Sequence, residues 1–337
     1  MAGDEIRSVD LLRSGSVSWN EWRRGNPGVQ PRLAGEDLSE MDLSGADLSE
    51  SDLTDAELFQ TDLSEANLKM AVMVDADLSG ANLRGAGLYK AQLSRACLIE
   101  AQFERANVSA ANLSNADLRG AVICQADLTE ADLSHADLSE ADFSGSNLTN
   151  ANIIGANLRS ANLAGANLAG LVHGSLDSKM GHYYGIRGLD SCFGNALFVR
   201  DAKDQDYLDT LMNSINQTRS TISGRWKLFW FHAWGLIDYG RSLGKLALGA
   251  LGVALLFGLV FHLDETFQWG FFDYPTTVNS LLTPYYYSVV TYTRLGSGGI
   301  SPTHWVGEIV LILERILGFV TLGLLLSILA NRVARRS

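Results

Sequence analysis

The stretch Met41–Met70, "MDLSGADLSESDLTDAELFQTDLSEANLKM", repeats every five residues. A large apolar residue occupies every fifth position from Leu33 to Leu168, about 28 times in succession. A small residue, most often Ala, lies two positions before it, and Asp or Asn often lies one position before it. This period fits neither a strand nor an amphipathic helix, whose periods are about 2 and 3.6 residues. A coil that turns a corner every five residues, with the large and the small residue pointing inward, accounts for the pattern.

The motif A(D/N)LSX resembles the pentapeptide-repeat family, and the resemblance covers residues 33–170. It implies a right-handed quadrilateral β-helix, also called a solenoid, with four repeats per coil. Seven coils stacked about 4.8 Å apart would form a rod of roughly 30 Å. Stacked repeats bury one continuous core and need caps at both ends. We therefore expect an N-terminal cap in residues 1–32 and a second cap in the connector, residues 171–224.

The repeats are acidic, and the whole chain carries a formal net charge of -12. Some pentapeptide-repeat proteins imitate DNA with an acidic surface and bind type II topoisomerases. The column of aspartates, which includes Asp37, Asp42, Asp127 and Asp132, is open to that interpretation. The other interpretation is that Asp and Asn at this position belong to the repeat of the fold. We favour the second, because a membrane function explains both halves of the chain, and we expect no nucleic-acid partner.

The connector predicts a helix from about residue 201 to residue 217, followed by an aromatic and basic segment, residues 225–242. That composition is typical of a helix at a membrane interface. The spacing of His182, Cys192, Asp201 and Asp204 fits no known set of metal ligands. No nucleophile–base set or phosphate loop appears in the sequence. We therefore expect no enzymatic activity, no catalytic residue, no metal site and no cofactor.

Two apolar segments, at about residues 244–263 and 305–331, are long enough to span a membrane. Bases flank them on the outside: Arg225, Lys227, Arg241 and Lys245 precede the first segment, and Arg332, Arg335 and Arg336 end the second. The part between them carries several acids and, before the second segment, the single base Arg294. Cytoplasmic flanks are enriched in Lys and Arg. The sequence therefore predicts a multi-pass protein of the inner (plasma) membrane, in contact with lipid, with both termini and the repeats cytoplasmic.

Between the two spans lies "SLLTPYYYSVVTYTRLGSGGISP", Ser280–Pro302. Residues 280–293 predict a helix too short to span, and backbone at membrane depth is tolerated only inside protein or along a watery pore. The segment from about Tyr286 to Asn331 resembles the pore module of two-transmembrane potassium channels, with "LGSGG" where the family has "VGYGD". The resemblance implies a homotetramer, a selectivity filter and hinge glycines at Gly318 and Gly323. The filter residues would be Thr293, Arg294, Leu295, Gly296, Ser297, Gly298 and Gly299.

The filter departs from the family at three positions. Gly296 and Gly298 keep the backbone freedom that aims carbonyl groups at an ion. By the resemblance, however, Arg294 replaces a threonine, Ser297 a tyrosine and Gly299 an acid. Two charges about 6 Å apart at an effective dielectric constant near 20 interact by about 3 kcal/mol, and arginine does not deprotonate. Our first hypothesis is thus a tetrameric channel that is not strictly potassium-selective and that passes anions, because rings of Arg are typical of anion pores.

A second hypothesis turns the Arg294 side chain away from the pore axis. Glu314 lies inside the second span, where an acid usually has a partner. An Arg294–Glu314 pair would neutralise the charge, support the filter and allow weakly selective cation conduction. Arg315 or a hydroxyl of the short helix are the other partners open to Glu314. A non-conducting membrane receptor is a third reading of the same module, and these alternatives stay open on the sequence alone.

Overall fold

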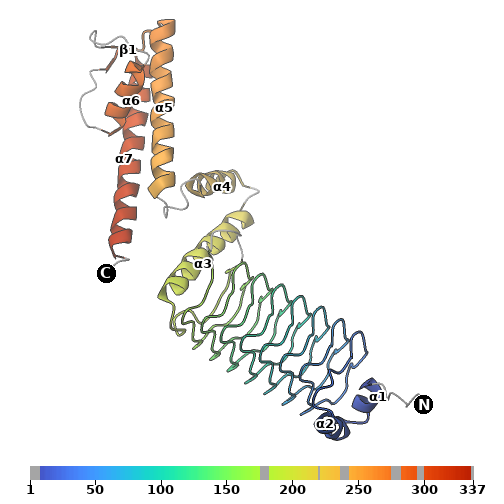
Figure 1. Ribbon diagram of the computed structural model, residues 1–337. Coiled ribbons are helices and arrows are strands. Elements are labelled where there is room, and N and C mark those ends of the chain that lie inside the picture. The colour runs from blue at the N-terminus through green and yellow to red at the C-terminus, as the bar shows by residue number, and fades with distance from the viewer. Residues whose placement is uncertain are drawn as a thin grey trace. The chain divides into compact units, whose positions relative to one another are not determined.

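The computed structural model describes residues 8–174, 182–218, 221–235, 243–274, 282–293 and 300–334. The chain divides into two compact units, residues 1–214 and residues 215–337. The first unit is a solenoid with helices at its two ends, and the second unit is built from helices (Figure 1).

The solenoid is held together by parallel β-bridges between residues 20 positions apart, such as Asp42 with Asp62 and Asp62 with Asn82. Since the sequence period is five residues, four repeats complete one coil. Backbone hydrogen bonds connect successive coils; Leu43 N, for example, donates to Asp62 O at 2.8 Å. Figure 1 shows the coils stacked as successive rungs. This is the predicted quadrilateral β-helix.

The core of the solenoid is the column of every-fifth residues. Each of the large apolar side chains from Leu33 to Leu168 is at most 3% exposed. The small residues two positions earlier, such as Ala46 and Ala66, are buried beside them. A small side chain is needed there because the four walls of the coil leave room for one large residue per repeat.

The Asp and Asn column closes the corners of the coil. Asp42 Oδ1 accepts a hydrogen bond from Ser44 N at 3.0 Å, and the same two-residue step recurs along the solenoid. The residue after this step has a left-handed backbone, as at Glu40 with φ 60°. Asp and Asn side chains bond their own backbone in this way and favour such turns. Hydrogen bonds from Ser44 lower the pKa of Asp42.

Asparagines also separate stacked acids in the last coils. One coil carries four aspartates and the next carries four asparagines, whose side-chain amides donate to the aspartates at 2.9 to 3.3 Å. The pairs are Asn147 with Asp127, Asn152 with Asp132, Asn157 with Asp137, and Asn162 with Asp142. These carboxylates therefore have structural partners within the fold, which supports the second interpretation of the acidic column.

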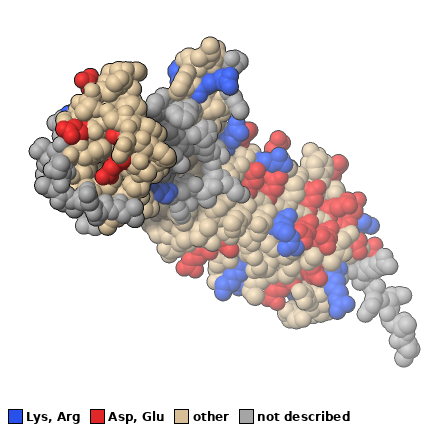
Figure 2. Space-filling model, turned by 90° about the horizontal axis from the view of Figure 1, so that it is seen from above, with Lys and Arg blue, Asp and Glu red and all other residues tan. Residues whose placement is uncertain are grey.

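The visible face of the solenoid mixes the two signs of charge: Figure 2 shows acidic side chains in patches with basic ones among them. Arg84 pairs with Glu104 at 2.7 Å and Arg119 pairs with Asp117 at 2.7 Å. Arg95 pairs with Asp75 one coil earlier. The basic side chains thus reduce the negative electrostatic potential of this face.

Two helices, α1 (Ser8–Arg13) and α2 (Ser16–Gly25), cover the first coil. Trp19 is fully buried against it and donates from Nε1 to Asp47 O at 2.8 Å. Asn20 bonds the same coil edge, donating to Gly45 O at 2.9 Å. These contacts satisfy backbone groups that an open coil would leave unpaired.

At the other end, residues 182–195 add an irregular turn that pairs Arg187 with Asn162 and Phe193 with Asn167. Helix α3 (Ala196–Gln217) follows, and its Phe198 is fully buried in the solenoid core. The helix begins five residues before the predicted start at residue 201, because Asn195 Oδ1 accepts the Phe198 backbone N–H at 3.0 Å as an N-cap.

The second unit contains α4 (Ile222–Gly235), α5 (Leu243–Phe267), α6 (Thr283–Thr293) and α7 (Trp305–Ala334). Strand β1 (Phe272–Asp273) pairs antiparallel with β2 (Ser301–Pro302). The predicted interfacial helix at residues 225–242 corresponds to α4, and residues 236–242 lie outside the described part. Helices α5 and α7 contain the two predicted spans, and α6 packs on both of them (Figure 1).

Candidate functional site

The candidate pore is the three-helix arrangement of α5, α6 and α7. Helices α5 and α7, with 25 and 30 residues, extend about 37 and 45 Å, whereas the hydrocarbon core of a bilayer is about 30 Å thick. Both are apolar enough to cross a membrane, and most of each span is exposed in the single chain. Helix α6 has 11 residues, about 16 Å, so it reaches only part of the way.

A buried hydrogen-bond chain joins the three helices. Glu314 of α7 is fully buried, and its Oε1 accepts a hydrogen bond from Ser288 Oγ of α6 at 2.6 Å. Ser288 Oγ also lies 2.7 Å from the Ala254 carbonyl oxygen of α5. The single proton of this hydroxyl therefore has two acceptors within reach. Glu314 Oε2 is buried too, and no described residue bonds it.

Two glycines allow α6 to approach its neighbours closely. A Cβ at Gly258 of α5 would lie 2.5 Å from Tyr285 Cδ1, and one at Gly318 of α7 would lie 2.1 Å from the Tyr292 carbonyl oxygen. Gly323, by contrast, has nothing within 4 Å. Gly318 thus serves close packing against the end of α6, while its predicted role as a hinge, like that of Gly323, stays a prediction.

The loop after α5 is held by Asp264, which is only 2% exposed. Asp264 Oδ1 accepts from the Phe271 backbone N–H at 3.0 Å, and Oδ2 lies 2.9 Å from Tyr274 Oη. Burial, with Asp264 beside the hydroxyl, raises the pKa of Tyr274, so this phenol stays protonated. The pairing of β1 with β2 then joins this loop to the segment that leads into α7.

The described residues of the loops between α5 and α7 lie on one side of the helical unit, called the loop side below, and the described surface there is acidic. Glu265, Asp273 and Glu308 are exposed, and no Lys or Arg occurs among the described residues between α5 Leu246 and α7 Glu308. Acidic groups around a pore entrance attract cations and repel anions.

Thr293 is the last residue of α6, and its Oγ1 donates to Val289 O at 2.6 Å. The other predicted filter residues lie outside the described part of the chain: Arg294, Leu295, Gly296, Ser297, Gly298 and Gly299. Glu314, the predicted filter support, bonds a hydroxyl of the short helix, which is one of the partners that the sequence left open to it, and its role in supporting the filter stays a prediction.

Comparison with protein families matches each unit to a known model. A model described as "Pentapeptide repeats" matches within residues 32–171, in overlapping stretches at 32–69, 61–98, 71–109, 101–140, 126–163 and 141–171. A model described as "Ion channel" matches residues 249–335, which include α5 from Gly249 onward, α6 and α7.

The chain carries pentapeptide repeats and a two-transmembrane ion-channel domain. Its channel domain, with two apolar helices, places the protein in a membrane. No curated protein matches the chain.

Solved structures similar to the repeats are pentapeptide-repeat proteins. HetL of the cyanobacterium Nostoc sp. is 29% identical, with 50% of this chain and 90% of HetL covered and a TM-score of 0.18. A thylakoid-lumen protein of Arabidopsis thaliana is 23% identical, with 50% and 88% covered and a TM-score of 0.27. QnrB1, a plasmid-mediated fluoroquinolone resistance protein, is 24% identical, with 43% and 83% covered and a TM-score of 0.24.

The channel domain uses residues that the sequence did not single out. These residues are Ser288, Asp264 and Tyr292, and none of them belongs to a recognisable motif. Their partners lie 7 to 34 residues away in the sequence. An acid at the end of an apolar run, like Asp264, is the one signal that could have identified this group. Among the described residues, no cluster of three or more His, Cys, Asp or Glu could hold a metal.

Proposed function

We propose that the chain is the subunit of a homotetrameric ion channel that conducts monovalent cations with weak selectivity, with its pentapeptide repeats in the cytoplasm. The observation that carries the proposal is the short helix α6 held between two membrane-long helices and ending where the glycine-rich loop begins. One such module supplies only a quarter of a pore of this type.

Glu314 supports cation conduction over anion conduction. Its carboxyl group is buried in a membrane-spanning helix and uses one oxygen, leaving Oε2 without a partner among the residues that are described. An unpaired buried charge is costly, so a cationic partner stabilises it. Arg294 follows α6 directly, and the end of α6 packs on Gly318, one helical turn from Glu314. We propose that Arg294 pairs with Oε2 of Glu314 and leaves the pore lumen free of its charge.

The acidic loop side supports the same ion preference. Glu265, Asp273 and Glu308 would raise the local concentration of cations at that mouth of the pore. An anion pore would gain nothing from this arrangement. The flanking bases of the two spans support an orientation with this mouth outside the cell and both termini in the cytoplasm, in a plasma membrane.

Arg315 supports assembly of several copies. It lies near the middle of the span at residues 305–327 and is exposed in the single chain. A charged side chain at the bilayer centre costs about 2.5–3.5 kcal/mol on insertion scales. A second copy of the chain that covers Arg315 and accepts its hydrogen bonds removes this cost.

Bilayer recordings of the reconstituted full chain under an asymmetric KCl gradient test the proposal. We expect a reversal potential on the cation side for the wild type. Glu314→Gln should shift it toward anions because Arg294 loses its counter-charge, and the double variant Arg294→Gln/Glu314→Gln should return it to the cation side. An anion-side reversal in the wild type that Arg294→Gln alone corrects would instead show that Arg294 faces the lumen. Absence of current and of flux into vesicles would support the non-conducting receptor.

A further inference from the structure

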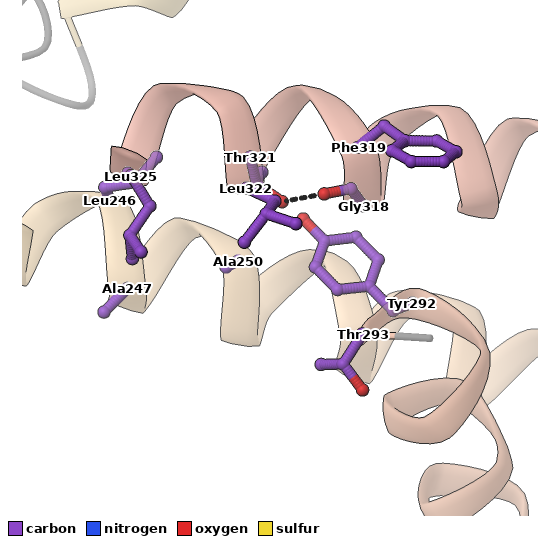
Figure 3. A pocket seen from close by; sticks show the side chains of 10 residues that line it. All are labelled: Leu246, Ala247, Ala250, Tyr292, Thr293, Gly318, Phe319, Thr321, Leu322 and Leu325. Carbon is purple, nitrogen blue, oxygen red and sulfur yellow. Dashed lines mark hydrogen bonds between the residues drawn. The ribbon is translucent and has the colours of Figure 1, made fainter. Parts of the chain in front are cut away.

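A cavity of about 190 Å³ lies between α5 and α7 beside the end of α6 (Figure 3). Its wall includes Leu246 and Ala250 of α5, Tyr292 of α6, and Gly318, Thr321 and Leu325 of α7. Most of the wall is apolar, and the cavity opens at the surface of the helical unit. All of the helices that form it belong to the membrane-embedded domain.

One polar side chain of this wall, Tyr292, can still donate a hydrogen bond. Tyr292 is only 6% exposed, and its hydroxyl, which points from α6 toward α7 in Figure 3, makes no hydrogen bond of good geometry with any described residue. The two threonines of the wall have used their protons, since Thr321 Oγ1 donates to Gly318 O at 2.9 Å and Thr293 Oγ1 donates to Val289 O. The Tyr292 hydroxyl lies beside Thr321 but forms no hydrogen bond of good geometry with it, and a buried hydroxyl in that position is unfavourable, so an occupant with an acceptor atom is stabilised here.

We propose that this cavity binds a small neutral amphiphile from the bilayer, a short-chain or aromatic alcohol, whose oxygen accepts a hydrogen bond from Tyr292 Oη. Apolar cavities of about 150 Å³ in proteins admit benzene, so a cavity of 190 Å³ admits a molecule somewhat larger. None of the described residues that line the wall is charged, so these residues favour a neutral occupant over a phosphate headgroup or an organic cation.

The occupant would lie against the contact between Gly318 and the Tyr292 carbonyl, where α7 supports the end of α6. Because the glycine-rich loop starts there, occupancy would change ion flow through the pore. This consequence rests on the proposed channel function, whereas binding itself does not.

Photolabelling of the full chain in phosphatidylcholine vesicles with a diazirine derivative of octanol tests the site. We expect saturable labelling, competed by hexanol, on peptides from all three walls. Ala250→Phe should abolish the labelling by filling the cavity. Tyr292→Phe should raise the probe concentration that gives half-maximal labelling by roughly threefold to tenfold, which is the usual value of one hydrogen bond. Leu248→Phe, at a side chain 70% exposed on the same helix, is the matched control and should label as the wild type.

Two outcomes would overturn the proposal: labelling that does not saturate, or labelling that Ala250→Phe and Leu248→Phe affect equally. If Ala250→Phe does not fold, judged by gel filtration, Ala247→Leu fills the same cavity. Currents recorded with and without hexanol separate the two proposals. Saturable labelling in a protein without current would retain the site and reject the channel function.

Discussion

Ser288 and Glu314 are joined by a buried hydrogen bond of 2.6 Å, although 26 residues separate them in the sequence. The same hydroxyl reaches the carbonyl of Ala254 at 2.7 Å. One side chain of the short helix therefore connects the two long apolar helices.

Replacing Ser288 by alanine should destabilise the channel domain. The change leaves Glu314 Oε1 buried without its donor, which costs about 1–3 kcal/mol, and the thermal unfolding midpoint in detergent should fall. Thr266→Ala is the matched control, because its hydroxyl bonds the His262 carbonyl on an exposed helix surface and its loss should change little. Equal midpoints for the two variants would contradict a structural role of Ser288.

Gly318→Ala should impair the domain more than Gly323→Ala. A Cβ at Gly318 meets the Tyr292 carbonyl at 2.1 Å and must displace α6, whereas a Cβ at Gly323 meets nothing within 4 Å. Alanine is the better helix former by roughly 1 kcal/mol, so Gly323→Ala should be neutral or stabilising. Thermal unfolding and vesicle flux measure both effects. If Gly323→Ala reduces flux without changing stability, the hinge role predicted for it gains support.

Arg315→Leu should weaken the oligomer. If a second copy covers Arg315 and accepts its hydrogen bonds, removing the charge leaves those acceptors unpaired in the membrane. Chemical crosslinking and native mass measurements report the fraction of tetramer. Ile312→Leu, also exposed on α7, serves as control. A tetramer fraction that rises in Arg315→Leu would show that the arginine faces lipid.

Asn157→Asp should destabilise the solenoid in a salt-dependent way. The new carboxylate would face Asp137, whose Oδ1 now accepts the Asn157 amide at 3.0 Å. Facing like charges in neighbouring strands cost roughly 0.2–1 kcal/mol, and salt screens the repulsion. Asn167→Asp loses the amide bonds to Asn147 and Thr149, but neither of these partners is an acid, so its effect should not depend on salt. Circular dichroism melting at two salt concentrations distinguishes them.

The solenoid should lose stability in acid. A hydrogen bond from Arg95 lowers the pKa of Asp75, and bonds from Ser39 lower that of Asp37. Groups whose pKa is lower when folded stabilise the fold above the unfolded pKa, about 4, and this contribution disappears as the pH falls through the folded value. Melting midpoints should therefore drop below about pH 4. Asp75→Asn should show a slightly smaller acid dependence, and an unchanged one would exclude a contribution from Asp75.

The sequence by itself determined the core of the solenoid and the two spans, while the resemblance to known families implied the β-helix and the pore module. In a coil that turns a corner every five residues, the large apolar residue of every repeat points inward, so Leu33 to Leu168 could be assigned to the core before any contact was known. The lengths of the two apolar segments likewise identified the spans, because a helix must reach a minimum length to cross a bilayer. These features depend on residues close in the chain, and local patterns are enough to find them.

Only the tertiary structure decided which groups meet at the pore helix. Among the described residues, the partner of Glu314 is the hydroxyl of Ser288, and the cavity beside Tyr292 needs walls from three helices. Gly318 could be recognised as special in the sequence, but its contact with the Tyr292 carbonyl follows from how α6 packs on α7. Such partners are set by helix packing over long sequence separations, and no local periodicity records them.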